Sequence, residues 1–109
     1  MNDFGFIRVA AAVPKVKVAN PRENVAEICS LASEAFDNGT SLVVFPELSV
    51  TGYTCGDLFG QETLIKGAEE GIARILKHSE GKETVLVVGT PVPFSGRLFN
   101  CAAVTSDGR

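Results

Sequence analysis

The sequence is poor in histidine, the side chain used most often for general acid–base catalysis and for metal binding. Among its 109 residues there is one histidine, His78, and there is no tryptophan. A single histidine excludes a metal site built on several imidazoles, and we predict no metal site in this chain. His78 falls in the last turn of a predicted helix, where a cationic side chain interacts favourably with the helix dipole. We therefore do not assign it to a catalytic triad.

The sequence also lacks paired cysteines, a net positive charge and long apolar runs. The three cysteines, Cys29, Cys55 and Cys101, are odd in number and have no C-x-x-C spacing, which favours free thiols in a reducing cytosol. The net charge of −3 gives no electrostatic reason to expect nucleic acid or an anionic membrane as partner. No apolar run approaches the roughly 18 residues of a membrane span, and Asp3 stands where an export signal carries positive charge. We expect a cytoplasmic protein with no nucleic-acid and no membrane partner.

The chain does contain apolar runs typical of alternating strands and helices. Residues 4–13 are rich in strand-forming residues. Asn20 and Pro21 then begin a helix as cap and first residue, and Asn38 with Gly39 ends it. The apolar positions of this helix recur at helical spacing and are Val25, Ile28, Cys29, Ala32, Ala35 and Phe36.

A second strand and helix follow. The continuous apolar run 42–45 is typical of a strand covered on both faces, as in a parallel sheet. Residues 61–79 have helical periodicity although Gly67 and Gly71 lie inside, each costing about 1 kcal/mol relative to alanine. Close helix packing is the favoured explanation for these glycines. With a further buried strand at 85–88, the order predicts right-handed crossovers and an α/β fold.

The last residues predict an incomplete hairpin. Residues 98–105 are typical of a strand, and Ser106-Asp107-Gly108 is a hairpin-turn signal. We expect another strand to follow this turn. The chain, residues 1–109, is therefore expected to be the N-terminal fragment of a larger domain.

One segment, residues 45–59, is a candidate for chemistry. In open α/β sheets, ligands bind beyond the carboxyl ends of the strands, and Glu47 comes two residues after an apolar strand at that end. Pro46 ends the strand because it cannot donate to a ladder. A carboxylate held in an apolar pocket can serve as a general base. Position and residue type alone, however, favour a solvated loop carboxylate or a backbone cap.

A family resemblance favours the catalytic interpretation of Glu47 over that of a solvated loop carboxylate. The run Val-Val-Phe-Pro-Glu-Leu at 43–48, followed by Thr-Gly-Tyr at 51–53, is similar to the first motif of the carbon–nitrogen hydrolases of the nitrilase superfamily. The longer string 46–59 resembles the glutaminase (amidase) domains of bacterial glutamine-dependent NAD synthetases, and the resemblance covers essentially the whole chain. It implies that the α/β chain is part of a nitrilase-like α-β-β-α sandwich.

The resemblance also implies a Glu-Lys-Cys triad that hydrolyses glutamine. In this family the cysteine attacks the amide carbonyl, the glutamate acts as general base and acid, and the lysine stabilises the oxyanion. Glu47 matches the triad glutamate, and Tyr53 matches an aromatic residue that lines the glutamine pocket. The lysine and the nucleophilic cysteine follow the hairpin in the family, beyond Arg109. The chain alone is therefore expected to be inactive.

The partners and cofactors follow from the same resemblance. In the synthetases, ammonia passes to a C-terminal domain of the same polypeptide, which uses ATP to amidate nicotinic acid adenine dinucleotide to NAD. No cofactor is expected in the present domain, whereas ATP and magnesium are expected in the synthetase domain. The full-length protein is expected to be a homo-oligomer.

Several alternatives stay open. A stand-alone amidase or carbamoylase of the same superfamily has the same first motif, and a non-catalytic α/β binding or assembly module would not need the missing triad members. Among the cysteines, Cys55 is the only loop candidate for a nucleophile, and a helix starting near Asp57 would favour its thiolate. Cys29 and Cys101 are expected to pack as small apolar side chains.

Overall fold

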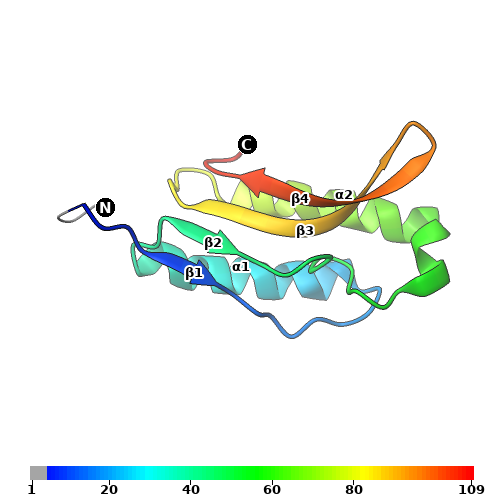
Figure 1. The fold of residues 1–109 in the computed structure, drawn as a ribbon, viewed down its shortest axis with the longest axis horizontal. Coiled ribbons are helices and arrows are strands. Elements are labelled where there is room, and N and C mark those ends of the chain that lie inside the picture. Colours follow the sequence, from blue (N-terminus) through cyan, green and yellow to red (C-terminus); the bar gives the residue numbers. More distant parts are fainter. Residues whose placement is uncertain (1–4) are drawn as a thin grey trace.

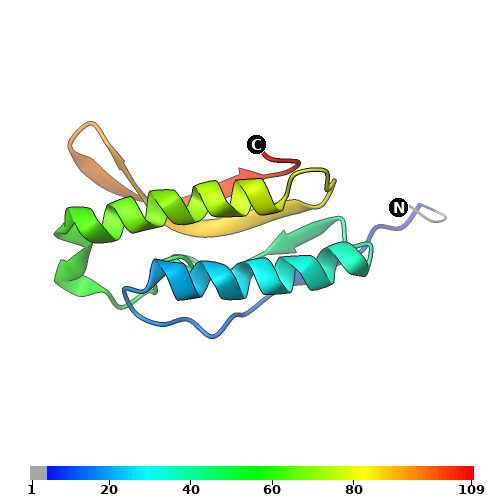
Figure 2. The same cartoon turned by 180° about the vertical axis from the view of Figure 1, so that it is seen from behind.

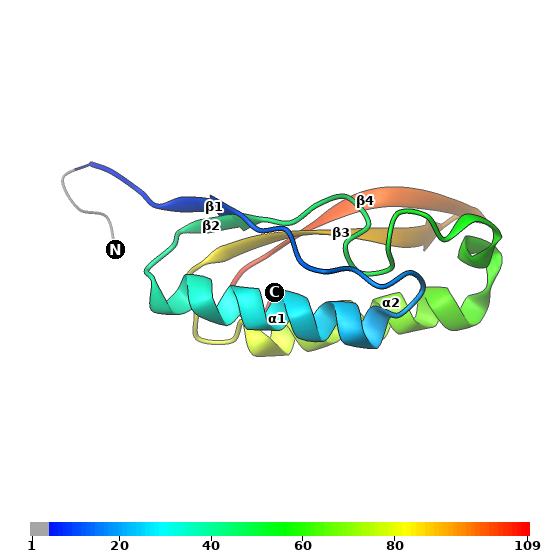
Figure 3. The same cartoon turned by 90° about the horizontal axis from the view of Figure 1, so that it is seen from below.

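Two α-helices cover one face of a four-stranded sheet in the computed structural model, which describes residues 5–109 (Figure 1). Strands β1, β2 and β3 are parallel neighbours, and β4 lies antiparallel beside β3. Figures 2 and 3 show both helices on the same side of the strands. The predicted α/β class is confirmed. The elements in chain order are β1 (Val9–Ala11), α1 (Pro21–Asp37), β2 (Leu42–Val44), the 3-10 helix η1 (Gly56–Gly60), α2 (Glu62–His78), β3 (Val85–Phe94) and β4 (Arg97–Thr105).

Strand β1 is shorter than predicted. The expected strand covered residues 4–13, whereas β1 contains three residues, and its predicted start at Phe4 lies outside the described residues, as does Asp3. The reason is its partner: β1 pairs in parallel with β2, which is itself only three residues long. Without a longer partner, the flanking residues have no ladder to join.

Helix α1 begins and ends where the sequence predicts. The Asn20 side chain accepts a hydrogen bond from the Glu23 N–H at 3.2 Å, and Pro21 is the first helical residue. The helix ends before Asn38, and Gly39 takes a left-handed conformation with φ of 68°. The predicted apolar stripe is confirmed: all its members are buried except Phe36, which is partly buried against the same core.

Helix α2 packs against α1 at its two internal glycines. An ideal Cβ on Gly71 would lie 2.7 Å from Val25 Cγ2, and one on Gly67 would lie 3.3 Å from Pro21 Cγ. Both distances are shorter than ordinary carbon–carbon contacts of about 3.5–4.0 Å. The predicted explanation, close helix packing, is confirmed. Neither α-helix of residues 5–109 is long and apolar enough to cross a membrane.

Strand β3 continues well past the predicted end at residue 88. It runs to Phe94 and forms a hairpin with β4 through Ser95 and Gly96, whose φ values of 51° and 72° are those of a two-residue type I′ turn. The hairpin was not predicted because Pro91 and Pro93 interrupt the strand pattern. The backbone nitrogens of both prolines face the β2 side of β3, beyond the end of β2, so their lack of an N–H costs no ladder hydrogen bond.

The face of the sheet opposite the helices is open. On the helix side, Val43 of β2 and Leu86 of β3 are almost completely buried, whereas Val44 and Val104 on the other face are 43% and 66% exposed. The apolar run of β2 predicted a strand covered on both faces, but residues 5–109 cover only one of them. The described chain supplies one helical and one sheet layer of the expected α-β-β-α sandwich.

Candidate active site

Glu47 lies on a loop that leaves the sheet at the carboxyl end of β2. The Phe45 N–H donates to the Val87 carbonyl at 2.9 Å. In a regular parallel ladder, the next donor on this side would be Glu47, bonding to the Gly89 carbonyl. Instead the Val50 N–H donates to Gly89 at 3.1 Å. Residues 46–49 are therefore looped out of the strand, and the Glu47 side chain is exposed.

The loop is compact and well packed. Leu48 is buried and has φ of 50°, a left-handed conformation that is unfavourable for a branched side chain. Its carbonyl accepts hydrogen bonds from the N–H groups of Thr51 at 3.2 Å and Gly52 at 2.7 Å. Ser49 is buried, and its Oγ has no partner among the described residues. Surrounding contacts must offset both local costs, so the loop conformation is determined by tertiary structure.

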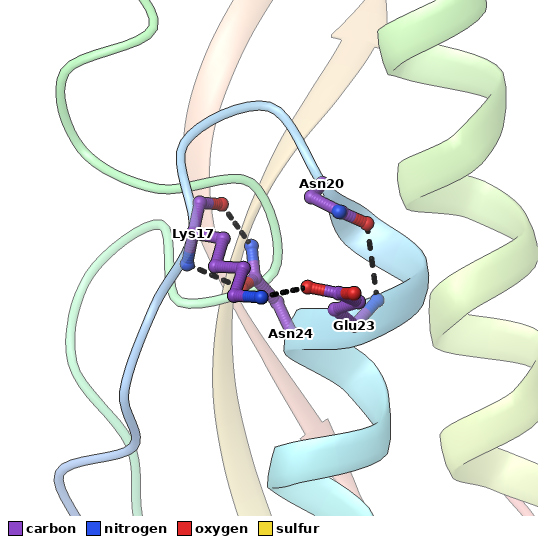
Figure 4. A network of polar contacts seen from close by, with 4 residues as sticks. All are labelled: Lys17, Asn20, Glu23 and Asn24. Atoms are coloured by element: carbon purple, nitrogen blue, oxygen red, sulfur yellow. Dashed lines mark hydrogen bonds and ion pairs between the residues drawn. The ribbon is translucent and has the colours of Figure 1, made fainter.

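Asn24 holds the far end of this loop to α1, and Figure 4 shows its hydrogen bonds with Lys17. Its side chain is 1% exposed and donates from Nδ2 to the carbonyls of Val50 at 2.9 Å and Lys17 at 2.8 Å. Its Oδ1 accepts from the Lys17 N–H at 2.7 Å. We did not predict this role. The available signal was a polar residue next to Val25 and four residues before Ile28, on the buried face of the helix.

Lys17 and Glu23 form an ion pair above the same network, with Nζ and Oε2 2.7 Å apart and both side chains more than half exposed. The hydrogen bond with Glu23, followed by its charge, raises the pKa of Lys17. Glu23 therefore does not complete a capping box with Asn20, and the Asn20 N–H donates instead to the Lys17 carbonyl at 3.3 Å. Exposure limits the stability that such a pair contributes.

Tyr53, the predicted pocket residue, lies on the same loop and is 66% exposed. Glu47 and Tyr53 thus share one segment, but residues 5–109 do not enclose their side chains. A surface hollow of about 620 Å³ is lined by residues of α1 and α2 and the two residues before α1, and neither Glu47 nor Tyr53 lines it. The two roles remain predictions.

The cysteines have structural surroundings. Cys55 is buried, and its Sγ donates to the Thr51 carbonyl at 3.2 Å, although η1 begins at the next residue. From its residue type Asp57 is expected to cap the helix that starts near it; this is wrong, because Asp57 lies in the first turn of η1, whose N-cap is Cys55. Burial raises the pKa of the Cys29 thiol, and Cys101 is partly buried. The structure presents no thiol of the three beside Glu47 in a thiolate-stabilising environment.

His78 lies in the last turn of α2, as predicted, and is its final residue. Its Nε2 lies 2.8 Å from Ser33 Oγ on α1, and its ring centroid lies 5.9 Å from that of Phe36. The histidine therefore connects the carboxyl end of α2 to α1. This position is on the helical layer, away from the loop that carries Glu47.

Similar proteins were found by sequence. A glutamine-dependent NAD(+) synthetase from Mycobacterium leprae is 34% identical over 104 residues, which is 95% of this chain and 15% of the relative. A protein of the same description from Xylella fastidiosa is 32% identical over 105 residues, 95% of this chain and 19% of the relative. The chain thus spans less than a fifth of the length of these relatives.

Solved structures and a family model agree with this similarity. A glutamine-dependent NAD(+) synthetase from Cytophaga hutchinsonii superposes with a TM-score of 0.86 at 26% identity, covering 94% of this chain and 17% of that chain. An amidase from Nesterenkonia sp. shares the fold, with a TM-score of 0.80 at 20% identity over 94% of this chain and 39% of that chain. The carbon-nitrogen hydrolase model matches residues 8–109. The resemblance inferred from the first motif is confirmed, and the chain belongs to the carbon-nitrogen hydrolase family.

Proposed function

We propose that the chain is the N-terminal part of the glutaminase domain of a glutamine-dependent NAD synthetase, and that Glu47 is its general base. The observation that carries the proposal is the loop at residues 46–49, which leaves the parallel ladder at the carboxyl end of β2 and presents Glu47. Ligands of open α/β sheets bind at this end of the strands. The sequence relatives, which are synthetases over 95% of this chain, support the choice of enzyme.

The chemistry assigned to Glu47 is proton transfer in two steps. Its carboxylate takes the proton of a cysteine thiol, the thiolate attacks the carbonyl carbon of the glutamine amide, and a lysine stabilises the oxyanion. Glu47 then gives the proton to the departing nitrogen, so that ammonia leaves and a thioester remains. In the second step Glu47 deprotonates water, which releases glutamate and restores the thiol. The cysteine and lysine belong to residues beyond Arg109.

The open face of the sheet supports a site in which this chain supplies Glu47 and later residues supply the lysine and the cysteine. Glu47 is exposed, and Tyr53, six residues later in the same segment, is 66% exposed. A general base acts efficiently only within hydrogen-bond reach of its proton donor and in a largely water-free site. The proposal therefore requires a second sheet layer that covers the open face and delivers the lysine and the cysteine to the loop. Tyr53 would then become a wall of the glutamine pocket.

The rest of the enzyme is part of the same proposal. Ammonia passes to a C-terminal domain of the same polypeptide, where ATP and magnesium support the amidation of nicotinic acid adenine dinucleotide. The assembled protein is a cytoplasmic homo-oligomer. A stand-alone amidase remains the second candidate because the Nesterenkonia amidase shares the fold. Synthesis of NAD from free ammonia by the full-length protein distinguishes the two, since a stand-alone amidase has no such activity.

The direct test is Glu47→Gln in the full-length polypeptide. The substitution preserves size but removes the ability to take a proton. We expect glutamine-dependent NAD formation to fall by about 10² to 10⁴-fold, while the ammonia-dependent reaction stays near wild type and reports correct folding. An equal loss of both reactions would make Glu47 structural, and an unchanged glutamine reaction would make it an ordinary loop carboxylate.

Tyr53→Ala is the companion variant because it removes the aromatic ring and leaves Glu47 in place. A lost pocket wall weakens glutamine binding more than the chemical steps, so KM for glutamine should rise while kcat changes little. Glutamine titrations with both nitrogen sources measure this difference. A fall in kcat with unchanged KM would contradict the pocket role of Tyr53.

A further inference from the structure

The backbone on both sides of Glu47 rests directly on one residue of β3, Gly89. Successive residues of a strand face opposite sides of the sheet, and Val88 is completely buried on the helix side. Gly89 therefore faces the open side, where the loop at 46–48 covers it (Figure 3 shows the helices on the other side of the strands). We propose that Gly89 is a positioning residue for the Glu47 carboxylate. This inference rests on the proposed function of Glu47.

The distances show why no side chain fits at this position. An ideal Cβ on Gly89 would lie 2.5 Å from the Pro46 carbonyl oxygen and 2.7 Å from the Glu47 carbonyl carbon, and it would come closer still to the Leu48 nitrogen. These three atoms belong to the two peptide units that flank Glu47. They are backbone atoms, which cannot rotate away as the end of a flexible side chain can. A methyl group at Gly89 would therefore displace Glu47 itself.

Space, rather than backbone conformation, is what requires glycine here. The residues of this region with left-handed φ are Leu48 and Gly52, at 50° and 95°, whereas Gly89 lies in the regular ladder of β3 with β4. Gly89 also fixes the other end of the loop, because its carbonyl accepts the Val50 N–H at 3.1 Å. The loop is thus seated on Gly89 where it leaves β2 and bonded to Gly89 where it returns.

Gly71 of α2 provides a matched control. An ideal Cβ there meets Val25 Cγ2 at 2.7 Å, a conflict similar in distance but with a side chain on the helical layer. Gly71→Ala should therefore disturb packing without moving the Glu47 peptide units. At Gly60 a Cβ meets nothing within 4 Å, so Gly60→Ala controls for the loss of a glycine alone.

The experiment compares these three alanine variants in the full-length polypeptide. Moving the Gly89 contacts to ordinary distances shifts the loop by about 1 Å, and a misplacement of about 1 Å can cost about 10²-fold in rate. We expect Gly89→Ala to lower kcat for glutamine hydrolysis by about 100-fold with little change in KM, and to leave the ammonia-dependent reaction near wild type. Gly71→Ala should lower the melting temperature while kcat at 25 °C stays close to that of the wild type and of Gly60→Ala.

The outcomes separate this inference from the proposed function. Full kcat in Gly89→Ala, together with a strong loss in Glu47→Gln, would overturn the role of Gly89 and leave the function intact. Full glutamine hydrolysis in Glu47→Gln would overturn the function itself. An equal loss of kcat in Gly89→Ala and Gly71→Ala would show that packing in general, not the seat of the loop, controls the rate.

A second variant tests the inference in case Gly89→Ala does not fold. Adding Leu48→Gly gives the loop backbone the freedom to lift off the new methyl group. We expect this double variant to recover the ammonia-dependent reaction but not glutamine hydrolysis, because the carboxylate is then held away from its position. Recovery of both reactions would overturn the inference. Loss of both would do so as well, because Gly89 would then serve the fold and not the carboxylate.

Discussion

The two faces of the sheet differ sharply in how completely residues 5–109 cover them. On the helix side Val43, Leu86 and Val88 are 0–1% exposed and form one core with α1 and α2. On the opposite side Val44 and Val104 are 43% and 66% exposed. One face therefore supplies the burial that stabilises the fold, while the other presents apolar surface together with the loop of Glu47. Stability and proposed chemistry are divided between the two faces.

The largest expected effect concerns the attachment of the Glu47 loop to the helical layer. Asn24 reaches from α1 to Val50, the residue at which the loop rejoins β3. Asn24→Ala leaves the Lys17 N–H and the Val50 carbonyl without partners and leaves the Lys17 carbonyl with the Asn20 N–H alone. This should destabilise the protein by about 3 kcal/mol, since each orphaned group costs about 1–3 kcal/mol. Urea unfolding measures this. Asn20→Ala is the matched control and should cost only about 1 kcal/mol as a lost helix cap; equal losses would contradict the bridging role.

Two consecutive valines of β2 test the comparison of the faces directly. Val43 is 1% exposed and Val44 is 43% exposed, on opposite sides of the same strand. In the 109-residue chain Val43→Ala should cost about 2 kcal/mol and Val44→Ala less than about 1 kcal/mol, because the buried side chain loses more transfer free energy and leaves a cavity. Urea midpoints of the two variants give the difference.

The same pair sharpens the comparison in the full-length polypeptide. If a second sheet covers the open face there, Val44 becomes buried and Val44→Ala should approach the cost of Val43→Ala. Persistence of the difference in the full-length protein would mean that no layer packs on this face. That result would count against the sandwich arrangement on which the proposed site depends.

The smallest expected effect is at the exposed end of the Asn24 network. Glu23 raises the pKa of Lys17 in the folded protein, so the ion pair stabilises the fold below the unfolded pKa, about 10.4, and this contribution is lost as pH rises through the folded pKa. Lys17→Met should shift the urea midpoint only slightly at pH 8. The shift should disappear in about 1 M salt, where exposed charges are screened. A larger loss than in Asn20→Ala would contradict this ranking.

Local signals predicted the helical layer well. The cap at Asn20, the stop at Gly39 and the apolar stripe of α1 depend on neighbours in sequence, and the glycines of α2 had a correctly inferred packing role. The first motif indicated the family and placed Glu47 after β2. Except for the glycines, whose partners Pro21 and Val25 lie on α1, these features share one property: the residues that decide them lie within a few turns of one another or within a single motif.

The features that escaped prediction depend on contacts between distant segments. The role of Gly89 arises because residues 46–48, some forty positions earlier, lie on it. The left-handed Leu48 is likewise held by its packed surroundings, since no turn residue stands at that position. The β3–β4 hairpin was missed because Pro91 and Pro93 are acceptable only where β2 has already ended. All three depend on how segments distant in the sequence are paired and packed, which local periodicity does not show.

Pro91 and Pro93 also determine how the distal hairpin can meet other molecules. Beyond Gly89, no strand of residues 5–109 lies beside the edge of β3 that faces away from β4, and the outward N–H donors of this edge are missing at both prolines. An extended peptide adding to this edge would find carbonyls but no matching donors, so growth of the sheet by backbone pairing is blocked there. A protein that binds along this edge of β3 must therefore do so mainly through side chains, without regular backbone pairing.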